Sequence, residues 1–264
     1  MEYSNYSTLK FSRDGHIPTV SLNRPENLNA VNADMERELP RFFTEVNYDS
    51  QTRVVILTGE GRTFSAGGDF DYMRQLIANP VQLRELIPNA KRLVFSLLEC
   101  TKPVIAKING HAIGLGATVA LGCDVTFAAE HARIGDPHVA VGLVAGDGGA
   151  IFWPQLAGYN KAREYLFTGE AVPAPVAEKI GLINHSVPLD ELDARVDAYA
   201  RKVAGMPVWA VQWTKASINL RLRQVANSVM DACFAYEALS AGSVDHREAV
   251  DALAAKRAPQ FTGL

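Results

Sequence analysis

Short apolar runs rich in β-branched residues alternate with longer segments of helical period, and this alternation limits the fold more than any other feature. Each run is closed by a turn-forming residue, as is typical of buried strands: residues 19–23, 54–59, 104–110 and 125–129. Between the first two runs, apolar residues recur at helical spacing: Met35, Leu39, Phe42 and Val46. Residues 69–99 are long enough for one or two further helices. Strands separated by helices predict an α/β fold.

The pattern changes after about residue 154, where strand-like runs nearly disappear and helical stripes dominate. Two such stripes are Leu192, Val196, Tyr199 and Val203, and then Met230, Phe234, Glu237 and Ala241. Pro173, Pro175, Pro188 and Pro207 stand near the expected helix starts. We expect an α/β core over residues 1–200 and a helical lobe over residues 201–264.

Charge and cysteine content exclude several classes of protein. Lys and Arg number 26 and Asp and Glu 29, with a net charge of -3, so neither a nucleic-acid surface nor a membrane patch is indicated. The chain starts without a signal-peptide pattern, and its longest apolar stretch, residues 112–123, is interrupted by glycines. Cys100, Cys123 and Cys233 have neither disulfide-framework nor metal-site spacing. We therefore expect a cytoplasmic protein without a metal, whose partner is a small molecule or another copy of itself.

Two glycine-rich turns are the most informative places for chemistry. FSAGGDF at residues 64–70 and NGHAIGLGAT at residues 109–118 each follow a predicted strand and lead into a helix. Glycine lets the backbone approach a ligand, and the first N–H groups of a helix have no partner within it. Two such turns could direct two N–H donors at one carbonyl oxygen. The alternatives are glycines that only close tight turns, or a phosphate loop, for which the motif is missing.

These turns and several other motifs resemble the enoyl-CoA hydratase/isomerase family, the crotonase superfamily. The motifs are FSAGGDF, INGHAIGLGATVALGCDV and IGDPHVAVGLVAGDGG, with SLNRP and LNA near the start, FTG in the middle and KRAPQF near the end. The resemblance covers nearly the whole chain. It implies a spiral of strand-strand-helix units with a helical trimerisation lobe, assembled as a homotrimer or a dimer of trimers.

The resemblance also implies a site for an acyl-CoA thioester, in which coenzyme A is part of the substrate and no separate cofactor is needed. It places the oxyanion hole on the backbone N–H groups of Gly68 and Leu115. The residues that it places near the substrate or coenzyme A are Asn27, Leu28, Ala30, Ala66, Asp69 and Lys256. For Lys256 the alternative is a solvated lysine at a helix end.

The departure from the family pattern concerns the acid/base residues. Enoyl-CoA hydratases place two glutamates where this chain has Thr118 and His138. Threonine cannot act as a general base near neutral pH, so the two-carboxylate mechanism of water addition is missing. A double-bond isomerase with a single glutamate at the position of His138 is also put in doubt.

His138 and Asp147 offer a different acid/base pair. A carboxylate on one ring nitrogen of a histidine leaves the other nitrogen free to take a proton from water. The alternatives are a structural histidine, and an aspartate that caps the helix expected after Gly148. His111, in the second glycine turn, could be another imidazole of the site, but a loop histidine with backbone hydrogen bonds is the expected role.

The spacing of His138 and Asp147 resembles the retro-Claisen branch of the superfamily, which hydrolyses a carbon–carbon bond in cyclic β-diketones. That branch also has a late-helix glutamate, which Glu237 resembles. The cost of burying an unpaired charge favours a solvent-exposed Glu237 instead.

Three hypotheses therefore stay open. The first is a lyase or isomerase that acts on acyl-CoA, as in fatty-acid breakdown. The second is a diketone hydrolase, and the third is a catalytically silent member of the family that binds a ligand. A separation of His138 and Asp147 above about 6 Å would favour the silent member.

Overall fold

The structure is a computed structural model that describes residues 3 and 5–264, with residues 80 and 82–87 described as backbone only. Its larger sheet has the strand order β1-β2-β3-β4-β6-β9, in which β1 is antiparallel to β2 and the other neighbours are parallel. These strands are β1 (Leu9–Asp14), β2 (Ile17–Leu22), β3 (Val55–Gly59), β4 (Val104–Ile108), β6 (Val125–Ala129) and β9 (His185–Val187). A smaller sheet contains β5 (Ala112–Ile113), β7 (Arg133–Gly135) and β8 (Val172–Pro173).

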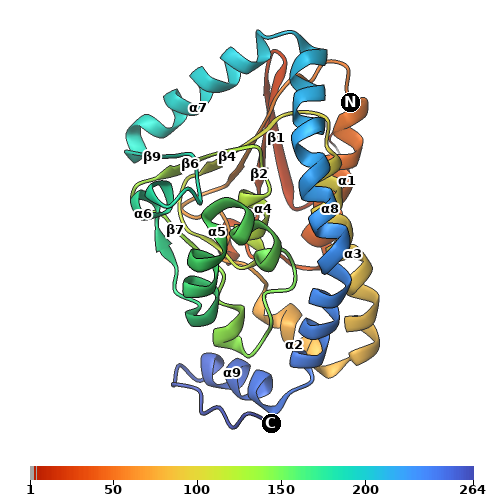
Figure 1. The fold of residues 1–264 in the computed structure, drawn as a ribbon, viewed down its shortest axis with the longest axis vertical. Coiled ribbons are helices and arrows are strands. Elements are labelled where there is room, and N and C mark those ends of the chain that lie inside the picture. Colours follow the sequence, from red (N-terminus) through yellow and green to blue (C-terminus); the bar gives the residue numbers. More distant parts are fainter. Residues whose placement is uncertain (1–2, 4) are drawn as a thin grey trace.

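The helices lie around these sheets (Figure 1). In chain order they are α1 (Ala33–Glu45), α2 (Phe70–Ala78), α3 (Pro80–Glu99), α4 (Leu115–Leu121), α5 (Gly149–Thr168), α6 (Ala174–Lys179), α7 (Leu189–Ala204), α8 (Val208–Ala241) and α9 (Val244–Ala254). A short 3-10 helix, η3 (His138–Val141), precedes α5. The α/β class predicted from the alternating pattern is confirmed.

Both faces of the larger sheet are covered by helices. Side chains along a strand point alternately to opposite sides, so each strand contributes to a core on either face. On β3, Val55 and Leu57 join the larger core beneath α1 and α3, whereas Ile56 joins a smaller core beneath α7. Strands buried on both faces read as continuous apolar runs. The four predicted runs each overlap an observed strand, with ends that differ by up to two residues.

Five strands were not predicted: β1, β5, β7, β8 and β9. Strand β1 carries Lys10, Ser12 and Arg13 on exposed positions and so lacks an apolar run. The other four have only two or three residues, too few to show a period. The expectation that strands nearly vanish after residue 154 holds, since only β8 and β9 follow.

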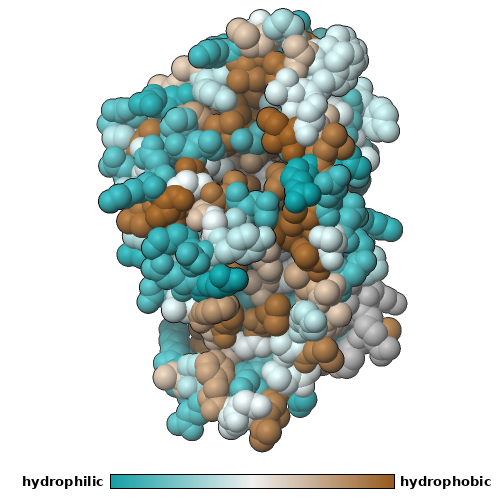
Figure 2. All heavy atoms as spheres, viewed as in Figure 1, coloured by the Kyte–Doolittle hydropathy of each residue, from teal (hydrophilic) through white to brown (hydrophobic). Residues whose placement is uncertain are grey.

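The carboxyl-terminal part is helical as predicted, and Pro173, Pro188 and Pro207 directly precede α6, α7 and α8. Helix α8 runs along the molecule in Figure 1 and packs against α3 and α5, with Met230 and Phe234 in the larger core. Helix α9 lies at the lower end in Figure 1. Figure 2 shows hydrophobic surface among hydrophilic residues at that end, where Val244 and Leu253 are exposed. In the described part of the chain, no helix has the length and apolar character needed to cross a membrane.

Candidate active site

One cavity of about 470 Å³ brings together residues from separate segments of the chain. It is lined by both glycine turns, by η3 and the loop after it, and by α1, α2, α8 and α9. Five predicted site residues line it together: Gly68, Leu115, His138, Asp147 and Glu237. Ala66 also lines it, whereas Asn27, Leu28, Ala30, Asp69 and Lys256 do not.

The two glycine turns lie against each other at one end of this cavity. Val31 pairs with Gly68, and Ser65 pairs with Ala112, in isolated parallel bridges. Gly114 has φ +53°, and a Cβ added there would lie 3.7 Å from the Cα of Gly67 and 3.9 Å from Cε1 of His138. A side chain at Gly114 would therefore be strained and would enter the space between the turns.

Gly68 and Leu115 each carry a free backbone donor. Leu115 is the first residue of α4, so no carbonyl of that helix can accept its N–H. Gly68 directly precedes Asp69, whose side chain caps α2 through the N–H groups of Asp71 and Tyr72. Neither N–H donates a hydrogen bond to another residue within the described ranges. The two donors are thus available to a ligand in the cavity.

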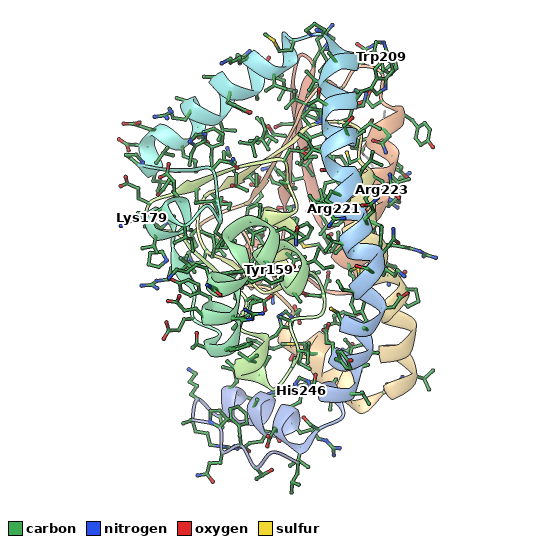
Figure 3. All side chains as sticks on the ribbon, viewed as in Figure 1. Tyr159, Lys179, Trp209, Arg221, Arg223 and His246 are labelled. Atoms are coloured by element: carbon green, nitrogen blue, oxygen red, sulfur yellow. The ribbon has the colours of Figure 1, made fainter. Side chains whose placement is uncertain are left out.

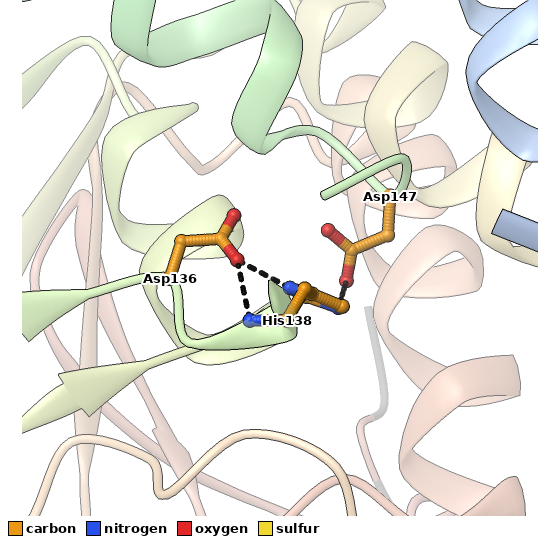
Figure 4. Close-up of side chains that lie close together, drawn as sticks. All are labelled: Asp136, His138 and Asp147. Carbon is orange, nitrogen blue, oxygen red and sulfur yellow. Dashed lines mark hydrogen bonds and ion pairs between the residues drawn. The ribbon is translucent and has the colours of Figure 1, made fainter. Parts of the chain in front are cut away.

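His138 lies between two carboxylates (Figure 4). Its Nδ1 hydrogen-bonds Oδ1 of Asp136, and that oxygen also accepts the backbone N–H of His138 at 3.3 Å. Its Nε2 lies 3.4 Å from Oδ2 of Asp147. Burial lowers the pKa of His138, but attraction to Asp147 and Asp136 and hydrogen bonds to both hold it well above the usual value. The two carboxylates therefore favour the protonated form of the imidazole.

Asp147 does not cap α5, and that alternative is wrong. The position before α5 is Gly148, and it provides no side-chain hydrogen bond to the helix. Asp147 instead accepts a 3.3 Å hydrogen bond from Oγ1 of Thr118 on α4. Gly148 has φ +143°, and a Cβ there would lie 2.4 Å from Cγ2 of Thr118. The glycine lets the backbone turn tightly, so that the carboxylate of Asp147 faces His138.

Glu237 is not exposed to solvent, so that expectation is also wrong. It continues the α8 stripe of Met230 and Phe234 to the point where the stripe meets the cavity. Its Oε2 is buried and has no hydrogen-bond partner among the described residues. Burial and the neighbouring Asp147 raise the pKa of Glu237 to about 8, while His138 opposes this shift. At neutral pH the side chain is mostly an uncharged acid.

Two other predicted side chains lie outside the cavity. His111 accepts a 3.1 Å hydrogen bond from the backbone N–H of Arg133, which confirms its expected role as a loop histidine. Lys256 is exposed just beyond the end of α9. Its contact with coenzyme A stays a prediction.

Sequence reasoning missed four polar residues of the cavity region: Asp136, Glu36, Tyr72 and His246. Asp136 comes two residues before His138, a short spacing that could have suggested the pair. Glu36 lies beside Met35 on the buried side of α1, where a carboxyl interrupts an apolar face. His246, labelled on α9 in Figure 3, hydrogen-bonds the carbonyl of Val141 at 2.6 Å. No local sequence signal marks His246 or Tyr72.

The carboxylates around His138 also have a geometry that could bind a metal. One ligand atom each from Asp136, His138 and Asp147 lie within 4.8 Å of one another. However, the imidazole itself bridges the two carboxylates, using Nδ1 for one and facing the other with Nε2. The arrangement therefore fits a proton-transfer group better than a metal centre, and the absence of a metal stays a prediction.

Comparison with known proteins assigns the family. The sequence model of the enoyl-CoA hydratase/isomerase family matches residues 12–263, and the chain belongs to this family. A short-chain-enoyl-CoA hydratase of Clostridium acetobutylicum is 33% identical over 252 residues, which cover 93% of this chain and 94% of the relative.

Solved structures agree with the fold. An enoyl-CoA hydratase/isomerase from Mycobacterium paratuberculosis has a TM-score of 0.90 and 36% identity, covering 94% of this chain and 99% of that chain. A β-diketone hydrolase from the cyanobacterium Anabaena, bound to (S)-3-oxocyclohexyl acetic acid, has a TM-score of 0.84 and 30% identity. It covers 91% of this chain and 96% of that chain. The predicted crotonase-like arrangement of strand-strand-helix units and carboxyl-terminal helices is thereby confirmed.

Proposed function

We propose that the chain acts on an acyl-CoA thioester whose carbonyl oxygen accepts hydrogen bonds from the N–H groups of Gly68 and Leu115. His138 and its carboxylates transfer protons to and from the bound acyl group or water. The observation that carries this proposal is that two unpaired backbone donors and a partly buried imidazole between two carboxylates share one cavity. Such donors stabilise negative charge as it develops on an oxygen.

The two carboxylates around His138 take different roles in this proposal. Asp136 holds Nδ1 and fixes the orientation of the ring, because its side chain is almost fully buried. Asp147 faces Nε2 at 3.4 Å, the side from which protons are exchanged. Asp147 acts as the base that accepts a proton from a carbon acid to form the enolate, or from water. The environment of His138 favours its protonated form, so His138 then acts as the acid that delivers a proton to the enolate.

Thr118 supports this division of roles. It stands where the family's hydratases have a glutamate, and its hydroxyl donates a hydrogen bond to Asp147. A hydroxyl cannot deliver or remove a proton at neutral pH in the way that a second carboxylate does. We therefore propose enolate-forming chemistry on an acyl-CoA in which hydration of a short enoyl-CoA is slow.

A second candidate is hydrolysis of a carbon–carbon bond in a cyclic β-diketone. The specific observation in its favour is that Glu237 joins His138 and Asp147 in the cavity, as expected from the resemblance to the retro-Claisen branch. The silent hypothesis loses its main support, since 3.4 Å between His138 and Asp147 is well below the separation that would favour it.

Binding of coenzyme A distinguishes the two candidates. Isothermal titration calorimetry with coenzyme A and acetyl-CoA should give micromolar dissociation constants if the substrate is a thioester. Absence of detectable binding by both would reject the acyl-CoA function and favour the diketone hydrolase.

We also propose that the protein assembles as a homotrimer or a dimer of trimers. Support comes from α8, which exposes large apolar side chains: Trp209, Trp213, Ile218 and Leu220. Figure 3 labels Trp209 near the start of this helix. Exposed groups of this kind often mark contacts between subunits. Light scattering coupled to size-exclusion chromatography would reject the proposal by giving the mass of a single chain.

A further inference from the structure

One wall of the cavity carries a polar pair that the proposed mechanism does not use. Glu36 on α1 is only 4% exposed, and its Oε2 accepts a 3.0 Å hydrogen bond from the hydroxyl of Tyr72 on α2. Both residues line the cavity, and the wall around them is apolar, with Val31, Met73 and Leu76. The other oxygen of Glu36, Oε1, takes part in no hydrogen bond with a described residue.

The environment of Glu36 favours its uncharged form. It makes no ion pair with any residue that the structure describes. Burial raises its pKa to about 7, the hydrogen bond from Tyr72 lowers it, and the charge of Asp147 raises it. The charged and titratable groups that face it come from four segments: Arg37 on α1 itself, Tyr72 on α2, Asp147 before α5, and Glu237 on α8. Below about pH 7, Glu36 is therefore a carboxylic acid with an O–H donor.

Packing alone does not account for this carboxyl group. An apolar side chain of similar size would complete the wall without the cost of burying a polar group that has a single partner. A second, independent group points to the same conclusion. Glu237 lines the same cavity, and its buried Oε2 has no partner among the described residues. Buried polar groups left unpaired in the protein are satisfied when a ligand provides the matching group.

The charges restrict what that group can be. Below about pH 7 the carboxyl groups of Glu36 and Glu237 are largely uncharged and can donate a hydrogen bond, so they match an acceptor on the ligand rather than a cation. A keto oxygen is uncharged and accepts hydrogen bonds only, so it matches a protonated carboxyl.

We propose that Glu36, held in place by Tyr72, determines specificity by binding a keto group of the substrate, separate from the carbonyl that Gly68 and Leu115 bind. This inference rests on the proposed function in one respect only, that the cavity is the substrate site. Substrates with a second, uncharged oxygen are then preferred over simple alkyl chains.

Calorimetric titration of the full chain with two matched ligand pairs tests this inference. One pair is hexanoyl-CoA and 5-oxohexanoyl-CoA, and the other is cyclohexanone and cyclohexane-1,4-dione. Near pH 6, the wild type should bind at least one keto ligand about three- to tenfold more tightly than its match, as expected for one neutral hydrogen bond. Near pH 8.5 the preference should fall, since an ionised Glu36 cannot donate to a ketone.

Three variants separate recognition from a structural role. Glu36→Leu should remove the preference at both pH values, and similar side-chain volume should preserve the fold. Glu36→Gln keeps an N–H donor but does not titrate, so it should keep the preference and lose its pH dependence. Tyr72→Phe should move the pH midpoint upward, because the hydroxyl that stabilises the ionised carboxylate is lost.

The outcomes also separate this inference from the proposed function. If only the cyclic pair binds, and its preference depends on Glu36, the acyl-CoA function is rejected and the inference stands. An undiminished preference in a folded Glu36→Leu protein overturns the inference, as does equal binding of the matched ligands by the wild type. Binding of none of the four ligands overturns both.

Discussion

Replacing Asp136 by asparagine should lower the pKa of His138 substantially while leaving the ring in place. The Asp136 side chain is 1% exposed and that of His138 is 12% exposed, so solvent screens their attraction weakly. An opposite charge at this range typically moves a pKa by about one to three pH units, which corresponds to roughly 1.4 to 4 kcal/mol. Asparagine has nearly the same shape and can still accept the hydrogen bond from Nδ1.

The assay is an NMR titration of the His138 ring in wild type and in Asp136→Asn. The linked stability follows a definite sign: because the folded pKa is raised, the stabilisation is complete below the unfolded value of about 6.5 and is lost as pH rises through the folded pKa. The unfolding free energy of the wild type should thus exceed that of the variant most clearly near pH 6, and the difference should narrow at higher pH. An unchanged His138 pKa in a folded Asp136→Asn protein would refute the reasoning.

Four further predictions concern the same cavity. His138→Ala and Asp147→Asn should each lower turnover by about 10² or more, with the double variant little worse than the poorer single one; additive losses would show that the two act separately. Leu115→Pro deletes one backbone donor at a first helical position that tolerates proline, so activity should fall about 10²- to 10³-fold, while the control Leu115→Ala stays active. Full activity of a folded Leu115→Pro protein would show that the Leu115 N–H does not bind the substrate oxygen. Glu237→Gln should stabilise the protein against urea at pH 8. Between pH 4.5 and about 8 the unfolded glutamate is ionised while the folded one retains its proton, which lowers the unfolding free energy of the wild type but not of the variant, so equal unfolding curves would contradict the raised pKa. Hydration of crotonyl-CoA should be far below the typical enzyme median of about 10 per second, because Thr118 replaces a carboxylate, and a rate near that median would disprove this.

The strands that the sequence predicts are those whose two faces are both covered by other parts of the protein. The run at residues 125–129 matches β6 without error, because strands covered on both faces are apolar throughout. The α1 stripe is equally clear, since Met35, Leu39 and Phe42 are fully buried. Strand β8 has two residues and forms only through its pairing with β7, so no local pattern could mark it.

The site divides in the same way between local and long-range information. The glycine turns and His138 lie in contiguous motifs, so the family resemblance locates them. Glu36 becomes part of the site only because α1 packs where the cavity forms, and the burial of Glu237 depends on how α8 crosses the core. The roles of the predicted residues, the assembly and the cytoplasmic location stay predictions.

The contact between Gly67 and Gly114 has a consequence for how activity is lost during unfolding. The two turns belong to different strand-helix units, separated along the chain by the whole of α2 and α3, and they meet through the bridge between Ser65 and Ala112 and through close packing of their backbones. No single unit can therefore hold both N–H donors at once. Long-range contacts of this kind carry a large loop-closure entropy and are lost together when either unit opens. When denaturant is added stepwise, the catalytic rate should therefore fall as soon as either of the two units unfolds. The loss of rate should not follow the unfolding of any single helix.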